Sequence, residues 1–159
     1  MNLLGLNTVL AFTWAFLTGS LTIASLAVGF AMGYVTLWLL QPLLGGPNPY
    51  FKKVYYWLRL LVMFHYELLV SSLAVVWDVI TPTQLSQPGL VHMPLDVKTD
   101  AGIFLVTNLI SLTPGTLSLD VSDDRKTLIV HAMFTDDPEE VCRTLKNGME
   151  RWVREAVEL

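Results

Sequence analysis

The first 51 residues of this 159-residue chain contain no aspartate, glutamate, lysine, arginine or histidine, and the first charged side chain is Lys52. A segment in water has no need to exclude charge, whereas each charge near the centre of a bilayer costs several kcal/mol. We therefore interpret this part of the chain as an integral membrane segment. The apolar run is too long for a cleavable signal peptide and lacks the basic residues that precede one.

Cysteine and clustered positive charge are also scarce. The single cysteine, Cys142, excludes an internal disulfide framework and any metal site built on several cysteines. Residues 81–159 carry seven Lys or Arg and twelve Asp or Glu, and the whole chain has a net charge of −4. This acidic balance argues against a nucleic-acid partner. No phosphate-binding loop, dinucleotide fingerprint or catalytic set is found, so we predict no catalytic, metal-binding or cofactor-binding residues.

The apolar region divides at Thr18-Gly19-Ser20. An unbroken helix over residues 3–44 would be about 60 Å long, twice the hydrocarbon thickness of about 30 Å. We therefore predict two transmembrane helices, at about 3–17 and 21–44. Gly29 and Gly33 form a G-x-x-x-G pair, which in an apolar helix predicts close packing against a partner helix.

A basic loop follows the second predicted span. Lys52, Lys53 and Arg59 come directly after the run Gly-Gly-Pro-Asn-Pro at 45–49, which is a strong stop signal. Short loops rich in lysine and arginine remain in the cytoplasm, so this loop is predicted to be cytoplasmic. A two-helix hairpin then places the N-terminus on the same side.

The third predicted helix, residues 54–80, completes a membrane domain over residues 1–80. One broad face of this helix carries polar side chains, which are Tyr56, Arg59, Tyr66, Glu67, Ser71 and Asp78. Because the opposite face is apolar, the helix is amphipathic and allows two arrangements. It lies in the plane of the membrane interface, which we favour because the acidic half then stays inside. Alternatively it crosses the bilayer with its polar face against partner subunits.

Four side chains of this helix are candidates for an ion path or a subunit contact: Glu67, Arg59, His65 and Asp78. A carboxylate at Glu67 could relay protons or Na+ inside the membrane, or could contact headgroups, water or a neighbouring subunit. Asp78 stands near the helix end, where a charge is tolerated. His65 falls on the apolar face, where it could titrate near neutral pH, be buried and hydrogen-bonded, or contact a subunit.

The remaining residues predict a linker at 81–94 and a small cytoplasmic α+β domain at 95–159. The linker is rich in proline and has little periodicity. The domain has the predicted order βαββα, with a short strand at 95–98, a helix at 100–112, a hairpin of strands at 117–121 and 127–134, and a final helix that begins at Asp137-Pro138.

The stretch Thr107–Thr116 (TNLISLTPGT), continuing through Leu119–Ser122 to Val130-His131-Ala132, resembles the MnhE family, the E-type subunits of the Mrp-type multi-subunit Na+/H+ antiporter. The layout is similar over nearly the whole chain: an uncharged hairpin, a basic loop, an amphipathic segment and an acidic tail domain. The Thr-Pro-Gly-Thr turn within this hydrophobic frame is the most specific part of the resemblance.

The resemblance implies an accessory, non-catalytic subunit of a prokaryotic plasma-membrane complex that exchanges Na+ for H+. Its partners would be the other antiporter subunits and the lipid bilayer, and it would support assembly, stability and ion exchange. It identifies no catalytic residues. Two alternatives remain open: a small membrane protein that transports ions alone, and a pump regulator with a ligand-sensing cytoplasmic tail.

Overall fold

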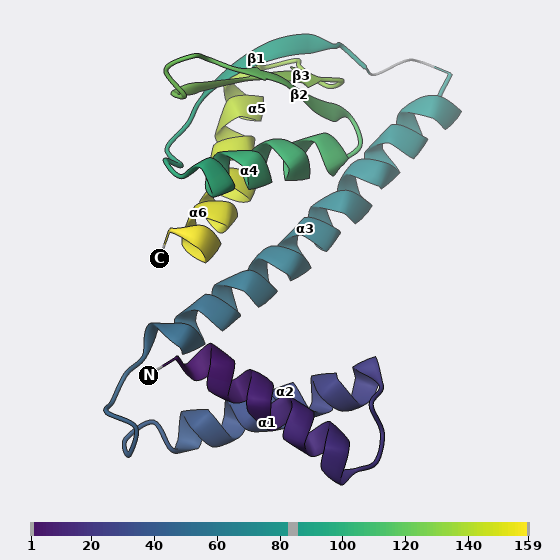
Figure 1. The fold of residues 1–159 in the computed structure, drawn as a ribbon. Coiled ribbons are helices and arrows are strands. Elements are labelled where there is room, and N and C mark those ends of the chain that lie inside the picture. Colours follow the sequence, from purple (N-terminus) through teal and green to yellow (C-terminus); the bar gives the residue numbers. More distant parts are fainter. Residues whose placement is uncertain (1, 83–85, 159) are drawn as a thin grey trace. The chain divides into compact units, whose positions relative to one another are not determined.

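The computed structural model describes residues 2–82 and 86–158, so positions 83–85 of the predicted linker and the last position of the predicted tail domain lie outside the described residues. The chain divides into two compact units, Met1–Val54 and Tyr55–Leu159. The described residues are mostly helical, with a small sheet of three strands in the second unit (Figure 1).

The first unit is a pair of helices, α1 (Leu3–Leu17) and α2 (Ile23–Leu39), together with the start of α3 (Pro49–Ile80). Two glycines of α2 allow its backbone to approach α1 closely. A Cβ atom at Gly29 would lie 2.8 Å from the carbonyl oxygen of Ala11, and one at Gly33 would overlap the Oδ1 atom of Asn7. The partner helix for the G-x-x-x-G pair is therefore α1 of the same chain.

A buried polar contact fixes the start of α3 in this unit. Asn7 is fully buried, and its Nδ2 donates a hydrogen bond of 2.7 Å to the hydroxyl oxygen of Tyr50. Around this contact lies a small apolar cluster that includes Leu3, Leu37 and Phe51. In an apolar hairpin, such a polar pair specifies one register of the helices, since any shift would leave two buried polar groups without partners.

The helix boundaries differ from those predicted at two places. The second helix ends at Leu39 rather than at residue 44, because Pro42 disfavours helical geometry at the residue before it. The third helix begins at Pro49 rather than at residue 54. Its start is set by Asn48, whose Oδ1 accepts from the backbone N–H of Tyr50, with proline in the first helical position.

These boundaries determine how the helix lengths compare with the thickness of a bilayer. Helix α1 has 15 residues and α2 has 17, or about 22 and 25 Å against a hydrocarbon core of about 30 Å. Within the described residues, only Pro49–Ile80 is both long and apolar enough to cross a membrane. The two full-length spans predicted for the N-terminal part are thus not matched by the lengths of its helices.

The second unit contains the sheet and the remaining helices. Strands β1 (Gly89–Pro94), β3 (Thr127–Ala132) and β2 (Thr116–Val121) lie side by side in that order, and both neighbouring pairs are antiparallel. The β2–β3 hairpin is the one that the alternating pattern predicted, with a bulge between Ser118 and Asp120.

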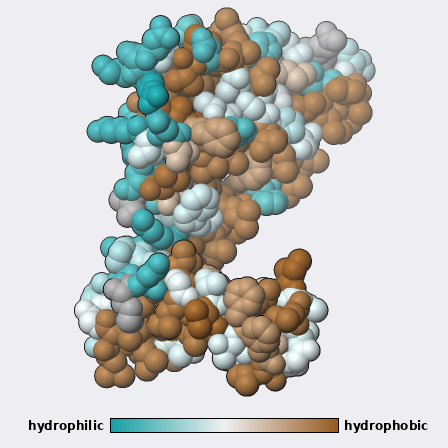
Figure 2. Space-filling model, in the orientation of Figure 1, coloured by the Kyte–Doolittle hydropathy of each residue, from teal (hydrophilic) through white to brown (hydrophobic). Residues whose placement is uncertain are grey.

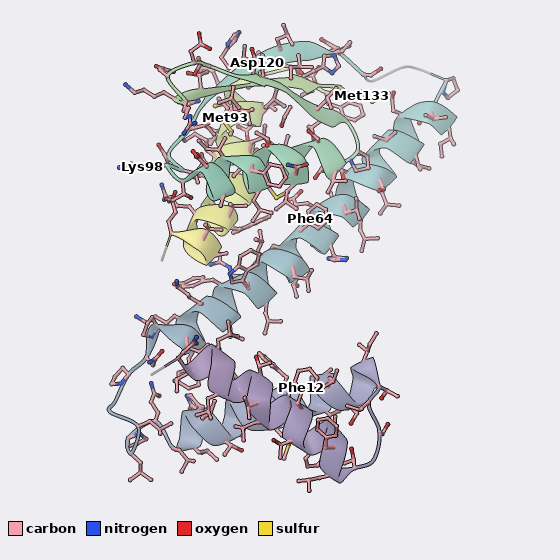
Figure 3. All side chains as sticks on the ribbon, viewed as in Figure 1. Phe12, Phe64, Met93, Lys98, Asp120 and Met133 are labelled. Carbon is pink, nitrogen blue, oxygen red and sulfur yellow. The ribbon has the colours of Figure 1, made fainter. Side chains whose placement is uncertain are left out.

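Helices cover one face of this sheet (Figure 1). They are α4 (Asp100–Leu112) and a C-terminal series of α5 (Pro138–Leu145), the π-helical turn η1 (Lys146–Glu150) and α6 (Arg151–Val157). Met93 of β1, drawn in Figure 3, is fully buried in the core between the sheet and these helices. Leu128, Val130 and Val153 are fully buried in the same core. Burial of such side chains gives about 25 cal/mol per Å² of apolar surface removed from water.

Strand β1 corrects the linker prediction. Residues 89–94 were expected to belong to a linker and 95–98 to a strand, whereas the structure has the strand at Gly89–Pro94 and an irregular segment at 95–98. Pro94 is the one proline within this strand, and it is tolerated because it is the last residue of β1, an edge strand that pairs with β3. In the segment that follows, the backbone N–H of Leu95 still donates to the carbonyl oxygen of Lys126 at 2.7 Å, and carboxylates accept from the N–H groups after it.

Two glutamates of the C-terminal helices hold this irregular segment. Glu150 is 2% exposed, and its Oε1 accepts from the backbone N–H groups of Asp96 and Val97 at 2.5 and 3.1 Å. Glu158 accepts from the backbone N–H groups of Lys98 and Thr99 at 2.7 and 2.9 Å. Partial burial acts to raise the pKa of Glu158, but the bonds from Thr99 and Lys98 outweigh it, and the pKa lies below its ordinary value.

The close approach at Gly33 leads to a first prediction. Gly33→Ala introduces a methyl group that overlaps the Asn7 side chain, and forcing such a group into a packed contact costs about 1–3 kcal/mol. We expect faster hydrogen–deuterium exchange across α1 and α2 in the purified protein.

Gly5→Ala is the matched control, because a Cβ atom there meets its nearest neighbours, atoms of Asn2, at an ordinary 3.6 Å. Both substitutions replace glycine with alanine in a helix and so change the intrinsic helix propensity in the same way. The difference in exchange rate between the two variants therefore reports the close approach of α2 to α1 at Gly33. Equal exchange in the two variants would contradict the packing described here.

Candidate functional site

The polar face of α3 is turned toward the α+β part of the second unit. Arg59 of α3 forms an ion pair with Glu155 of α6, with 2.6 Å between Nη1 and Oε2. Both side chains are largely shielded from solvent, at 27% and 16% exposed, and Arg151 pairs with the other oxygen of Glu155 at 3.0 Å. The Arg59–Glu155 ion pair binds α3 to the C-terminal helices. The charge of Arg59 is therefore balanced by a residue of the same chain.

Apolar side chains beside Arg59 extend the same contact. Leu60 is buried in the core of the second unit, and Tyr56, Met63 and Phe64 pack against that core. Figure 3 shows Phe64 on α3. The helix therefore contributes to the core of the α+β part of this unit rather than standing apart from it.

Glu67 lies about two helical turns beyond Arg59 along α3. Its side chain is half-buried and lines a cavity of about 250 Å³, together with Ser71 of α3 and residues of the 113–116 turn and of α5. Arg59 and Glu67 share a helix face, as the helical spacing predicts, but the cation is paired with Glu155 and not with Glu67. Within the described residues, the Glu67 carboxylate has no ion-pair or hydrogen-bond partner.

Asp78 and His65 occupy contrasting environments. Asp78 is 6% exposed and its Oδ1 accepts from the backbone N–H of Ser86 at 3.0 Å, so the carboxylate binds the backbone shortly before β1. His65 is exposed, and its Nδ1 lies 2.8 Å from the carbonyl oxygen of Leu61 in the same helix. The burial considered for His65 is not found in this chain, which leaves the ring accessible for a contact outside it.

The Thr-Pro-Gly-Thr turn joins α4 to β2 and shapes the cavity wall. The hydroxyl groups of Thr113 and Thr116 donate to the carbonyl oxygens of Leu109 and Ile110, at 2.8 and 2.7 Å. Gly115 has a φ of 87°, a left-handed conformation that favours glycine. The motif therefore ends a helix and starts a strand, which requires these residue types at these positions.

The acidic hairpin turn at 122–126 is held internally. Asp124 accepts from the Ser122 hydroxyl at 2.6 Å and from the backbone N–H of Lys126 at 3.1 Å. The Ser122 bond is the main reason that the pKa of Asp124 lies below its ordinary value. No group of three or more metal-ligating side chains occurs among the residues that the structure describes.

Several residues that organise the molecule were not singled out from the sequence. Asn7, Glu150 and Glu155 each contact partners that lie 43 to 96 residues away along the chain. The only sequence signal was residue type, since each is a polar or charged side chain within a helix or helical turn. Burial of a polar side chain implies a partner, but its identity depends on the tertiary fold.

The Arg59–Glu155 pair generates a second prediction. Arg59→Met keeps the apolar stem and removes the charge, leaving the shielded Glu155 carboxylate with one partner fewer. We expect the free energy of unfolding of the second unit to fall by about 1–3 kcal/mol. The measurement is a urea titration followed by the fluorescence of buried Trp152, in a background in which the other four of the five tryptophans are replaced by phenylalanine.

Arg125→Met is the control, since it breaks the ion pair between Arg125 and Asp100. The side chains of this pair are 63% and 77% exposed, respectively. A solvated pair contributes about 0–1 kcal/mol. An equal loss in both variants would show that the Arg59 pair is no more important than a surface pair.

Comparison with known proteins identifies the family. A family model described as "Na+/H+ ion antiporter subunit" matches residues 7–156. The E1 subunit of the Na(+)/H(+) antiporter of Staphylococcus haemolyticus is 41% identical over 153 residues, which cover 96% of each chain. The E1 subunit of Staphylococcus aureus (strain bovine RF122 / ET3-1) is 36% identical over 97% of this chain and 96% of its own.

Two solved structures are also similar. A chain in the Mrp complex from Dietzia sp. DQ12-45-1b is 28% identical with a TM-score of 0.50, over 61% of this chain and 91% of its own. A chain in the membrane-bound sulfane sulfur reductase, an archaeal respiratory membrane complex, has a TM-score of 0.54 over 96% of both chains; at 24% identity it shows a shared fold. From the model match over residues 7–156 and relatives at 36–41% identity, we conclude that this chain belongs to the MnhE family of Na+/H+ antiporter subunits.

Proposed function

We propose that this chain is an accessory membrane subunit of a multi-subunit Na+/H+ antiporter, where it supports assembly, stability and ion exchange without itself being an enzyme. The observation that carries the proposal is the family match over residues 7–156. Its partners are the other antiporter subunits and the lipid bilayer, in a prokaryotic plasma membrane, and Na+ and H+ are handled by the whole complex.

The chemistry of the first unit supports this role. Many large apolar side chains of α1 and α2 are exposed, including Phe16 at 67%, Leu17 at 81% and Ile23 at 88%. Figure 2 shows hydrophobic residues over much of the visible face of this unit. With no charged residue before Lys52, such a surface suits lipid and the apolar faces of partner helices.

Assembly is the property to measure first. Deleting the chain from its complex should give incomplete complexes on native gels and loss of Na+-driven proton flux in inverted membrane vesicles. The purified chain alone in liposomes should give no such flux, because its N-terminal hairpin has no Asp, Glu, Lys, Arg or His side chain to carry ions across lipid. Flux from the chain alone would instead favour a stand-alone transporter.

The contacts of α3 support one of the two arrangements of this helix relative to the membrane. Arg59 binds Glu155, and Ala74, fifteen residues farther along, lines the same cavity as Gly115 and Glu140. These contacts extend along about 22 Å of helix. A helix crossing the bilayer with such a neighbour along it would draw a charged domain into hydrocarbon, at a cost of several kcal/mol for each charge.

We therefore infer that α3 lies along the cytoplasmic interface, with its apolar face toward lipid and its polar face against the cytoplasmic α+β domain. The apolar hairpin of α1 and α2 enters the bilayer, with the basic residues Lys52 and Lys53 on the cytoplasmic side. Support for an apolar, lipid-facing side of α3 comes from exposed residues such as Leu58, Leu69 and Ile80.

These three residues provide a depth measurement, because they are 11 residues apart and share one helix face. In a Cys142→Ser background, spin labels at Leu58→Cys, Leu69→Cys and Ile80→Cys should show similar, shallow depths in reconstituted complexes. A helix across the bilayer would place the middle label about 16 Å from either end along the axis. A deep label at position 69 with shallow labels at 58 and 80 would refute the interfacial arrangement.

A further inference from the structure

One cavity of the second unit is not explained by the fold alone. It has a volume of about 250 Å³ and is bounded by α3, the Thr113–Thr116 turn and the start of the C-terminal helices. Its wall is mainly apolar, with Ile110, Phe134 and Met149 among the lining residues. Packed interiors contain few voids of this size, so an accessible one of apolar character suits an inserted group.

The charge at this cavity is unbalanced. Two carboxylates line it, those of Glu67 and Glu140. Glu140 forms an ion pair with Arg143, one turn farther along α5. The carboxylate of Glu67 has no cationic or hydrogen-bonding partner within the described residues, although its backbone carbonyl accepts from the Ser71 hydroxyl at 2.6 Å. A half-buried carboxylate beside an apolar wall is stabilised by a cation that enters with an apolar neighbour.

The size of the cavity limits the kind of molecule that could supply this cation. Sites that enclose a drug-sized molecule have volumes of about 300–1,000 Å³, and this one is smaller. A volume of about 250 Å³ accommodates the anchor side chains of a protein segment instead. Anchors of this kind, large apolar or arginine side chains in a pocket, contribute most of the affinity at protein interfaces.

We propose that this cavity docks a segment of another antiporter subunit, which inserts a large apolar side chain and places an adjacent lysine or arginine against Glu67. The proposal rests on the proposed function, which supplies a complex with other subunits. Glu67 is then a contact residue that determines partner choice by charge, while the apolar wall contributes affinity. The segment reaches the cavity between α3 and α5, where Ala74 and Thr144 are both exposed.

Photocrosslinking in the intact complex tests this contact. A photoreactive phenylalanine analogue replaces Thr144, which is exposed at the cavity, and the cross-linked peptide is identified by mass spectrometry. We expect a peptide from another subunit that contains a lysine or arginine next to a large apolar residue. Glu67→Gln should lower the cross-linking yield on the order of tenfold, the effect of losing one shielded charge pair.

Glu139→Gln is the matched control, because Glu139 is an exposed carboxylate of α5 that does not line this cavity. It should leave the yield within about twofold. If Glu67→Gln disturbs folding, a charge exchange distinguishes a folding defect from the loss of the charge pair. Glu67→Arg combined with glutamate at the identified cationic position of the partner should restore cross-linking, because a folding defect would not be repaired by a change in the partner.

Failure of this proposal is distinguishable from failure of the proposed function. A complex that contains the chain on native gels, but gives cross-links only within the chain or to lipid, overturns the docking site and leaves the accessory role intact. Equal yields for the Glu67 and Glu139 variants also overturn it. Absence of the chain from any complex would overturn the proposed function itself.

Discussion

A helix with one polar and one apolar face must meet two different environments, and in this chain the polar face of α3 meets the α+β domain of the same polypeptide. The Arg59–Glu155 ion pair, the burial of Leu60 and the cavity at Glu67 all lie on that face. Because Arg59 and Glu67 of the polar stripe are shielded by this domain, the surface of α3 that remains exposed is mainly apolar, although Tyr66 is 59% exposed. This contact surface joins residues 55–80 of α3 to the α+β domain within the second unit.

Much of this organisation could be predicted from local sequence. Residue types that lie close together in the chain predict four of its features. These are the apolar character of the first 51 residues, the helix that starts near Asp100, the hairpin that ends at Ala132 and the helix start at Asp137-Pro138. Each depends on short-range physics such as capping, turn formation or alternation of polar and apolar residues. Such signals act over a few residues, and they need no knowledge of the tertiary fold.

The features that could not be predicted depend on partners distant in sequence. Strand β1 forms because β3, about 40 residues later, offers an edge, and the segment after it is irregular because Glu150 and Glu158 accept from its backbone N–H groups. Arg59 is assigned to Glu155 rather than to Glu67 only by the packing of α6. Helical spacing correctly places Arg59 and Glu67 on one face, but it cannot say what covers that face.

The distribution of polar groups also explains how a subunit can serve ion exchange without carrying the ions. An ion path through lipid needs a succession of polar or ionisable groups, because a bare charge in hydrocarbon is costly. The helices α1 and α2 contain no Asp, Glu, Lys, Arg or His, and the Nδ2 atom of the fully buried Asn7 donates to the Tyr50 hydroxyl. Of the charged groups of α3, Arg59 and Asp78 make contacts within the chain and Glu67 faces a cavity beside the α+β domain, whereas Lys52, Lys53 and His65 are exposed. In the accessory role proposed above, these charges would position protein surfaces, and other subunits would supply the groups that conduct Na+ and H+.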